Sequence, residues 1–358
     1  MKKKYQNAFF AFGIAVLILM ASQLDFAEAW KSLTHAGYWF FAVVALWAFL
    51  YVFNTSSWWL IIHSKNGEGA YEATNHEGTG GESRRTLEQT SEEKISFPWL
   101  YKVTVSGFAL NYATPGGLMG GEPYRMMMLA PKIGTERASS SVILYVMTHI
   151  FSHFWFWLIS IPLYLLTQHV STFMAIVLSV MTSVCLLAIW FFMKGYRRGL
   201  AVSGMNLLRH IPFVKRWAKP FVEKHREQLD TIDRQIAALH NQSPRTFWTA
   251  VGLELSCRIA SALEVLFTLL VFMPSVNYFD CILVISFTTL FANMLFFMPL
   301  QLGGREGGFL MSITGLGFGL TAEAALNAAI FVALIVRIRE LIWTAIGLLL
   351  IKFDRKKD

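Results

Sequence analysis

Two glutamates stand at breaks in long apolar stretches of this 358-residue chain. Glu122 ends the run Pro-Gly-Gly-Leu-Met-Gly-Gly-Glu, and Glu306 ends the run Pro-Leu-Gln-Leu-Gly-Gly-Arg-Glu. An uncompensated charge inside an apolar segment costs about 2.5–3.5 kcal/mol on insertion scales, so such a residue is a functional hypothesis by default. Arg125 and Arg305 stand close to the two glutamates. Each break can therefore offer both signs of charge to a ligand, or carry a proton.

The broken backbone at these two places supplies a second kind of binding group. Irregular backbone at membrane depth is tolerated where it is buried in protein or lines a water-filled cavity. Exposed amides at a half-helix N-terminus attract an anion such as phosphate, and exposed carbonyls attract a cation. Glycine allows the turn and the close approach of a ligand, but it also allows close helix packing, and both explanations stay open. The candidate substrate-binding residues here are Asn111, Pro115, Gly116, Gly117, Gly120, Gly121, Asn293, Gly303 and Gly304.

Further ionisable residues interrupt two later apolar stretches: Glu254, Arg258 and Glu264 in the first, and Arg337, Arg339 and Glu340 in the second. Glu254 and Arg258 are four residues apart, so they can pair on one helix face. That pair is either structural or a substrate contact. Arg337 and Glu340 can likewise contact substrate or pair within the last helix.

His149 and His153 are one helical turn apart. Two histidines at this spacing could bind a metal, and together with Glu122 they would suggest an intramembrane hydrolase. The sequence has no His-Glu-x-x-His motif and no third ligand at a recognisable spacing, so we expect no metal and no cofactor. Lining of a polar cavity and plain packing are the other interpretations of the two histidines.

The elements that position these residues must lie in a bilayer. Hydrophobic residues make up 55% of the chain, charged residues 15%, and the mean hydropathy is +0.47. A soluble domain of this length needs more charge to cover its surface. In a membrane protein, the net charge of +8 indicates which loops face the cytoplasm and attract anionic lipid head groups. We therefore expect no nucleic-acid partner.

The apolar runs predict an all-α polytopic membrane protein. About 20 apolar residues span the hydrocarbon core. Six runs meet this need: 8–24, 38–62, 138–166, 170–193, 247–272 and 323–351. The first run follows Met-Lys-Lys-Lys, and we expect a retained helix there, not a cleaved signal peptide. Basic residues predict that both termini lie in the cytoplasm.

The two broken stretches, 98–137 and 278–320, are predicted to be re-entrant hairpins. The loop before the first stretch follows two spans from an inside start, and the residues after its break are basic, so this stretch enters and leaves on the cytoplasmic side. The second stretch must enter and leave on the outer side if the last helix is to end in the cytoplasm. The hairpins are therefore expected to enter from opposite faces.

Residues 1–169 and 170–358 then share one order of elements: span, span, hairpin, span. Because the first half begins inside and the second outside, we predict an inverted-topology repeat within a single membrane domain, 1–358. Two polar segments interrupt this order. The acidic, Gly-rich segment 63–97 is predicted to be a disordered insertion, and the basic segment 194–246 is predicted to be cytoplasmic, with an amphipathic helix.

The first break and the apolar run after it resemble the flippase-like domain of lysylphosphatidylglycerol synthases, in the residues ATPGGLMGGEPYRMMML and SSSVILYVMTHIFSHFWFW. They are also similar to the stand-alone membrane proteins grouped with that domain. The second break resembles the same family's later glycine-rich block, in MPLQLGGREGGFLMSITGLGFGLTAEAAL. The resemblance implies opposed re-entrant hairpins that move a phospholipid head group between leaflets. Seven residues follow Ile351, so we expect no aminoacyltransferase domain and no enzymatic activity.

The leading prediction is a lipid transporter of the bacterial cytoplasmic membrane. A polar or anionic head group would contact Arg125, Arg305 and Arg337 between the hairpins, while Glu122 and Glu306 would balance those charges or carry protons. The expected partners are a phospholipid or another polar lipid and the bilayer itself, and a homo-oligomer stays open. Three alternatives remain: an ion-coupled carrier of a small anion, an intramembrane metal-dependent enzyme, and a non-transporting assembly subunit.

Overall fold

The computed structural model describes residues 26–63, 95–113, 120–198, 244–294, 304–316 and 318–354. Within these ranges the regular structure consists of ten helices and no strand, which confirms an all-α polytopic membrane protein. The predicted span 8–24 and most of the polar segments 63–97 and 194–246 lie outside the described residues.

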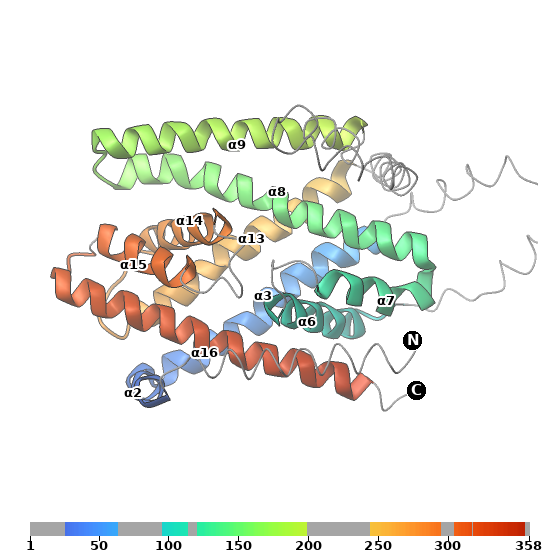
Figure 1. Ribbon diagram of the computed structural model, residues 1–358, viewed down its shortest axis with the longest axis horizontal. Helices are drawn as coiled ribbons and strands as arrows, with labels where there is room; N and C mark the ends of the chain where they lie inside the picture. Colours follow the sequence, from blue (N-terminus) through green and yellow to red (C-terminus); the bar gives the residue numbers. More distant parts are fainter. Residues whose placement is uncertain are drawn as a thin grey trace, which may run out of the picture.

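Five long helices run along the bundle (Figure 1): α3 (Tyr38–Ile62), α8 (Thr135–Thr167), α9 (Thr172–Arg198), α13 (Pro244–Leu269) and α16 (Ala322–Asp354). Each is longer than the roughly 20 residues that cross a hydrocarbon core. Three contain a described segment that is both long and apolar enough to span: 38–62, 137–167 and 172–194. The other two, α13 and α16, were also predicted as spans, and they carry buried charges.

The two broken stretches each form a pair of shorter helices. The first pair is α6 (Phe97–Ala113) and α7 (Gly121–Ile133), and the second is α14 (Tyr278–Met294) and α15 (Gly304–Leu316). The 13 residues of α7 and of α15 correspond to about 20 Å of helix, which is shorter than a hydrocarbon core of about 30 Å. The two helices of each pair pack against each other, and their re-entrant course through the membrane stays a prediction. We call the two pairs hairpin 1 and hairpin 2.

The outer ends of the two hairpins lie at opposite ends of α8. Hairpin 1 ends at Ile133, and α8 begins two residues later at Thr135. At the far end of α8, the Gln168 amide donates to the Asp280 carboxylate in the first turn of hairpin 2, with 2.8 Å between Nε2 and Oδ1. Figure 1 shows the same arrangement, with α6 and α7 toward one end of the bundle and α14 and α15 toward the other.

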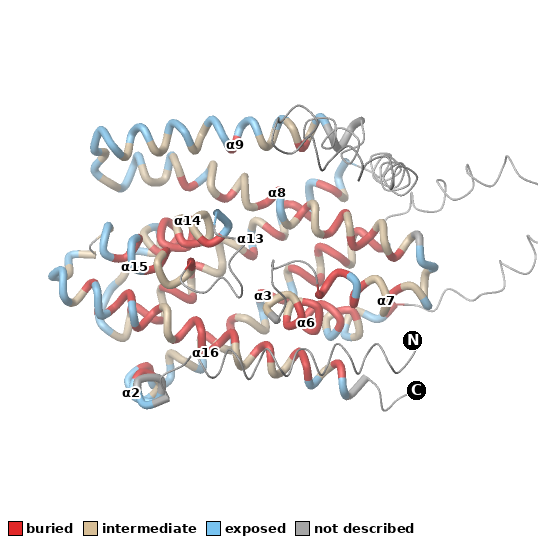
Figure 2. The backbone as a smooth tube through the Cα atoms, in the orientation of Figure 1, coloured by how far each residue is buried: buried red, intermediate tan, exposed pale blue. Residues whose placement is uncertain are grey.

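The centre of the bundle is the antiparallel pair of α3 and α13. The Ser57 hydroxyl donates to the Ala250 carbonyl at 3.3 Å, and the Asn54 amide donates to Glu254 at 3.0 Å. On the two sides of this pair, α6 packs against α16 and α14 packs against α8, while α7 packs against α8 and α15 against α16. Figure 2 shows that the buried backbone is concentrated in these inner helices.

Two close helix contacts depend on glycine. A Cβ on Gly308 of α15 would lie 2.8 Å from the Cα of Thr288 in α14, and a Cβ on Gly347 of α16 would collide with Ala109 of α6. Small residues let helix backbones approach in a membrane, where dispersion contacts drive association. Glycine therefore allows close helix packing at these two positions, neither of which is among the candidate substrate-binding glycines.

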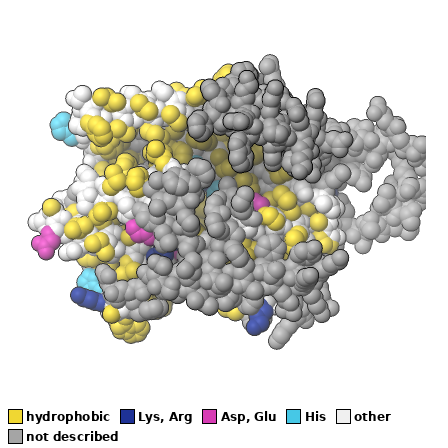
Figure 3. Space-filling view, in the orientation of Figure 1, with side chains coloured by type: hydrophobic (Ala, Val, Ile, Leu, Met, Phe, Trp, Pro, Cys, Tyr) yellow, Lys and Arg dark blue, Asp and Glu magenta, His cyan; other side chains and the backbone are white. Residues whose placement is uncertain are grey.

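The periphery presents apolar side chains outward. Among the described helices, α9 makes extensive contacts only with α8. Most of its apolar segment is exposed on the surface of the protein. On the face shown in Figure 3, the described side chains over α8 and α9 are mostly hydrophobic, as a lipid-facing surface requires. The short amphipathic helix α2 (Phe26–Ala36) was not predicted. It packs on α16, with the His35 ring against Phe331.

Candidate functional site

Charged side chains from both hairpins and from α13 and α16 gather in the interior of the bundle. They form three clusters that we name by their position. The hairpin-1 cluster is Asn111, Glu122 and Arg125. The hairpin-2 cluster is Arg305, Glu306, Arg337 and Glu340. The histidine cluster is Asn54, His149, His153, Glu254 and Arg258.

The hairpin-1 cluster pairs its charges with each other, although Glu122 Oε2 and Arg125 Nε are buried without a hydrogen-bond partner among the described residues. The Arg125 guanidinium donates to Glu122 Oε1 at 3.2 Å, and the Asn111 amide donates to the same oxygen at 2.9 Å. The Gly121 amide, at the start of α7, donates to Asn111 Oδ1 at 2.7 Å. The half-helix N-terminus that was expected to attract an anion is thus capped by Asn111, with Glu122 in its first turn. These contacts leave little room for a ligand at this amide.

Aromatic rings hold Arg125 in place. Its guanidinium carbon lies 4.7 Å from the centroid of Phe108, 5.1 Å from that of Tyr145 and 6.0 Å from that of Trp58. Its side chain also lies against Gly107, where a Cβ would be 3.0 Å from the guanidinium carbon. Arg125 is 1% exposed. Cation–π contacts strengthen when the cation is desolvated, so this arginine mainly stabilises hairpin 1.

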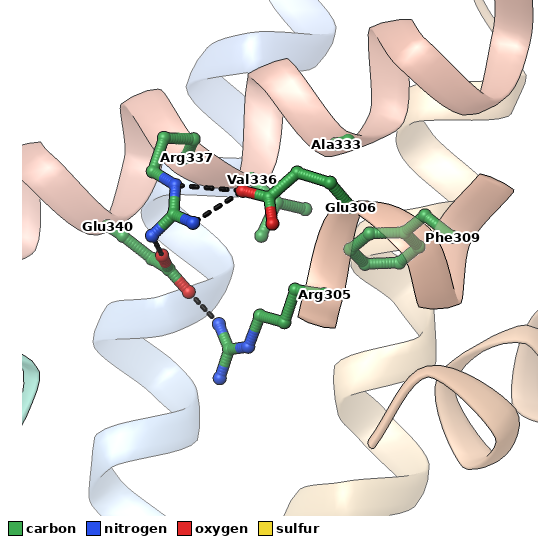
Figure 4. Close-up of a pocket in the computed structure, with 7 residues that line it drawn as sticks. All are labelled: Arg305, Glu306, Phe309, Ala333, Val336, Arg337 and Glu340. Atoms are coloured by element: carbon green, nitrogen blue, oxygen red, sulfur yellow. Dashed lines mark hydrogen bonds and ion pairs between the residues drawn. The ribbon is translucent and has the colours of Figure 1, made fainter. Parts of the chain in front are cut away.

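The hairpin-2 cluster joins hairpin 2 to α16 through a chain of ion pairs (Figure 4). Arg305 pairs with Glu340, Glu340 pairs with Arg337, and Arg337 pairs with Glu306. The neighbours Arg305 and Glu306 therefore each bind a residue of α16. The chain is graded in exposure: the Glu340 side chain is 1% exposed, whereas that of Arg305 is 25% and that of Glu306 is 38% exposed.

A small pocket lies among these four charges, with Phe309, Ala333 and Val336 as its apolar wall (Figure 4). The surrounding side chains leave no room in it even for a water-sized sphere. A ligand can therefore enter only if an ion pair opens or α15 moves away from α16. Arg305 and Arg337 both line this pocket, and a guanidinium group can bind an oxyanion in a bidentate manner.

A separate buried ion pair braces the helices next to this pocket. Arg339 donates to both carboxylate oxygens of Glu264, at 2.7 and 3.0 Å, and its guanidinium carbon lies 3.9 Å from the Trp47 ring centroid. This contact connects α16, α13 and α3. The sequence marked Arg339 and Glu264 as ionisable, but nothing local predicts a pair 75 residues apart.

The histidine cluster corrects the predicted pair on α13. Glu254 Oε2 accepts from the Asn54 amide at 3.0 Å and lies 2.7 Å from His149 Nδ1. Arg258 instead donates to the Ser152 hydroxyl and to the His149 carbonyl, both at 2.7 Å. The predicted Glu254–Arg258 pair is therefore wrong, because Arg258 turns to α8 and Glu254 turns toward α3 and the His149 ring.

His153 continues this cluster along α8. Its ring centroid lies 5.6 Å from that of His149, and its Nδ1 is buried without a hydrogen-bond partner among the residues that the structure describes. In the same described ranges, no three His, Cys, Asp or Glu side chains are grouped as metal ligands. The two histidines lie beside charged groups of the interior, and their lining of a polar cavity stays a prediction.

The two hairpins meet through Tyr112, near the inner end of α6. The guanidinium carbon of Arg305, at the inner end of α15, lies 5.7 Å from the Tyr112 ring centroid. This tyrosine was not among the predicted site residues. The only sequence signal for it is its place next to Asn111, because a single aromatic residue in an apolar run is common.

The remaining predicted residues divide into three groups. Gly120 and Gly304 are buried at the starts of α7 and α15. Asn293 does not mirror Asn111, because its amide donates to the Thr289 carbonyl one turn earlier in its own helix, at 2.7 Å. Pro115, Gly116, Gly117 and Gly303 lie outside the described residues.

Comparison with known proteins agrees with the resemblance seen in the sequence. The family model described as "Lysylphosphatidylglycerol synthase TM region" matches residues 8–347. No curated protein and no solved structure matches the chain. Because the family model covers most of its length, the chain belongs to the lysylphosphatidylglycerol synthase TM region family.

Proposed function

We propose that this membrane protein moves a lipid with a polar or anionic head group from one leaflet to the other. The observation that carries the proposal is the hairpin-2 cluster, where Arg305 and Arg337 stand in a pocket whose outer member, Glu306, is 38% exposed. The family is lipid-related and the chain is a membrane protein, which agrees with a substrate drawn from the bilayer.

The alternating charges give a means of exchange. A lipid phosphate that enters the pocket can replace a carboxylate on Arg305 or Arg337, because guanidinium binds both groups in the same bidentate geometry. The arginine then stays paired throughout, and the cost of a bare buried charge is avoided. The displaced Glu306 or Glu340 needs a proton or a cation. The acyl tails would remain in the lipid beside the opening.

We also propose that the two halves are inverted repeats that alternate access to this site. The contacts of hairpin 1 with α8 and α16 have counterparts in the contacts of hairpin 2 with α16 and α8. Hairpins whose outer ends lie at opposite ends of the bundle would expose the site to one leaflet at a time. The cytoplasmic location of both termini remains part of this proposal.

Reconstitution into liposomes tests the transport proposal. Purified protein is placed in vesicles that contain fluorescent phosphatidylglycerol, phosphatidylethanolamine or lysylphosphatidylglycerol, and dithionite quenches the label in the outer leaflet. We expect fast equilibration of at least one lipid by the wild type. Arg305→Ala and Glu306→Gln should each slow it strongly.

Matched controls separate the pocket from general damage. Glu323→Gln and Arg245→Ala change the same residue types at exposed positions near the starts of α16 and α13. Both should equilibrate lipid as fast as the wild type. If the wild type does not exceed empty liposomes for any lipid class, the transport proposal is wrong.

A further inference from the structure

The histidine cluster contains a glutamate whose surroundings differ from those of the other charged core residues. Glu254 is 0% exposed, and its Oε1 has no hydrogen-bond partner among the described residues, as is also the case for one oxygen of Glu122 and one of Glu340. What sets Glu254 apart is its charged partner. Its ionic partner is His149. The other glutamates of the interior pair with arginine: Glu122 with Arg125, Glu264 with Arg339, Glu306 with Arg337, and Glu340 with Arg305 and Arg337.

This difference makes the charge of the pair depend on one proton. With a proton present, the pair is either imidazolium–carboxylate or imidazole–carboxylic acid, and both forms are neutral overall. Without it, a carboxylate remains in a fully buried position, where the Asn54 amide and the nearby Arg258 cation compensate it. The hydrogen bonds of Arg258 go to two neutral oxygens of α8. Arg258 and the ionised Glu254 therefore balance each other in charge, and one proton on the His149–Glu254 pair adds one positive charge to the interior.

Few other ionisable groups act on this pair. Arg258 and Cys257 do so from α13, Arg125 from α7, and Tyr145 and His153 from α8. Helix α3 contributes the Asn54 amide, and α6 contributes the Phe108 ring. Arg125 is paired with Glu122, whereas Arg258 donates only to neutral oxygens. When the proton leaves, Glu254 therefore keeps the Asn54 amide and the charge of Arg258 as its compensation.

His153 links the pair to the head-group pocket. It follows His149 by one turn of α8, and its buried Nδ1 has no partner in the described part of the chain. Beyond it, Arg305 of the hairpin-2 cluster is close enough to act on His153 electrostatically. His153 is thus within electrostatic reach of both the His149–Glu254 pair and the pocket.

We propose that His149 and Glu254 form a single-proton binding site, separate from the head-group pocket, that couples lipid movement to the proton gradient. The inference deepens the proposed function and rests on it for its transport test. A phosphate that enters between Arg305 and Arg337 brings a negative charge into a core whose described ion pairs are balanced. One proton taken up with it restores neutrality, and release of that proton on the other side resets the carrier.

The test measures how labelled lipid is distributed between the two leaflets when a pH difference is applied across the membrane. Proteoliposomes with fluorescent phosphatidylglycerol are given a difference of one pH unit across the membrane, while valinomycin and equal potassium hold the potential at zero. One proton per lipid predicts a leaflet ratio of about tenfold for each pH unit. Glu254→Gln keeps the size and the Asn54 contact but removes the titrating carboxylate, so its ratio should fall to one. Glu323→Gln should keep the wild-type ratio.

Two results of this assay would overturn the proposal while leaving lipid transport intact. One is a wild type that equilibrates lipid but shows a ratio of one at every pH difference. The other is a Glu254→Gln protein with the wild-type ratio. If Glu254→Gln does not give a monodisperse folded protein, His149→Gln decides the matter by the same criteria.

A second measurement does not depend on transport. In nitrogen-15 histidine NMR of the purified protein, the His149 signal is assigned by its loss in His149→Gln. A shared proton predicts that the titration midpoint of this signal moves in Glu254→Gln and stays in Glu323→Gln. An unchanged midpoint in Glu254→Gln would refute the proton site even if lipid is transported. A moved midpoint in a protein that transports no lipid would refute the transport proposal alone.

Discussion

The two hairpins consist of helices of equal length, 17 and 13 residues in each, yet their charged residues are paired in different ways. Hairpin 1 pairs Glu122 and Arg125 with each other and surrounds the arginine with aromatic rings. Hairpin 2 sends Arg305 and Glu306 to separate partners on α16 and leaves both partly exposed. One hairpin is held together from within, and the other can exchange its partners.

This difference indicates a division of labour. A charge that is satisfied inside its own element stabilises that element and has little to offer a ligand. A charge that is satisfied by a neighbouring element can release it when a competing ion arrives or when the elements separate. We therefore infer that hairpin 1 is the fixed half of the site and hairpin 2 is the half that binds and moves.

The largest expected effect is on the fixed half. Arg125→Gln leaves Glu122 without its cation and removes three aromatic contacts, so the free energy of unfolding should fall by about 3–5 kcal/mol. Thermal or denaturant unfolding in detergent measures this change. A loss below about 1 kcal/mol would show that hairpin 1 is not held by this pair, and the comparison would break.

A steric change separates packing from binding in hairpin 2. Gly308→Ala places a Cβ 2.8 Å from the Cα of Thr288, and overpacking of this kind costs about 1–3 kcal/mol. Gly315→Ala in the same helix has nothing within 4 Å of its new Cβ and serves as the control. Equal melting temperatures for both variants would contradict the close contact between α14 and α15.

The two asparagines sharpen the comparison directly. Asn111→Ala removes the acceptor of the Gly121 amide and a donor to Glu122, which should cost about 1–3 kcal/mol of unfolding free energy. Asn293→Ala removes one exposed contact within its own helix and should change stability by less than about 0.5 kcal/mol. Similar losses in the two variants would mean that the hairpins are capped alike.

The smallest effect on stability is expected in hairpin 2. Arg305 is 25% exposed, so Arg305→Gln should cost only about 0–1 kcal/mol of unfolding free energy. Lipid equilibration by the same protein should nevertheless fall strongly. A variant that unfolds as readily as Arg125→Gln would place Arg305 among the structural residues.

Much of the fold could be predicted because its signals are local. Proline and paired glycines inside an apolar run marked both hairpins, and the predicted starts at 98 and 278 lie within one residue of the observed helices at Phe97 and Tyr278. The Glu122–Arg125 pair is compatible with its sequence spacing, since its members stand at i and i+3 of one helix. The short helix α2 was missed because eleven residues give only a weak periodic signal.

The partners that set each charge's role could not be predicted. Glu254 binds Asn54 across 200 residues, and Arg339 binds Glu264 across 75. Such pairs depend on how each helix is rotated about its axis, which packing decides and local spacing does not. The wrong pairing of Glu254 with Arg258 follows from this, because the i,i+4 rule describes an isolated helix.

Helix α16 has a mechanical consequence for the whole molecule. Its Arg337 and Glu340 hold hairpin 2, and its Gly347 packs tightly against α6 of hairpin 1. Arg337 and Gly347 are ten residues apart, or about 15 Å along one continuous helix. A rod of that length is stiff, so a displacement of hairpin 2 acts as a lever on hairpin 1. A helix-breaking substitution between Glu340 and Gly347 would uncouple the two hairpins while leaving the residues of the hairpin-2 ion pairs unchanged.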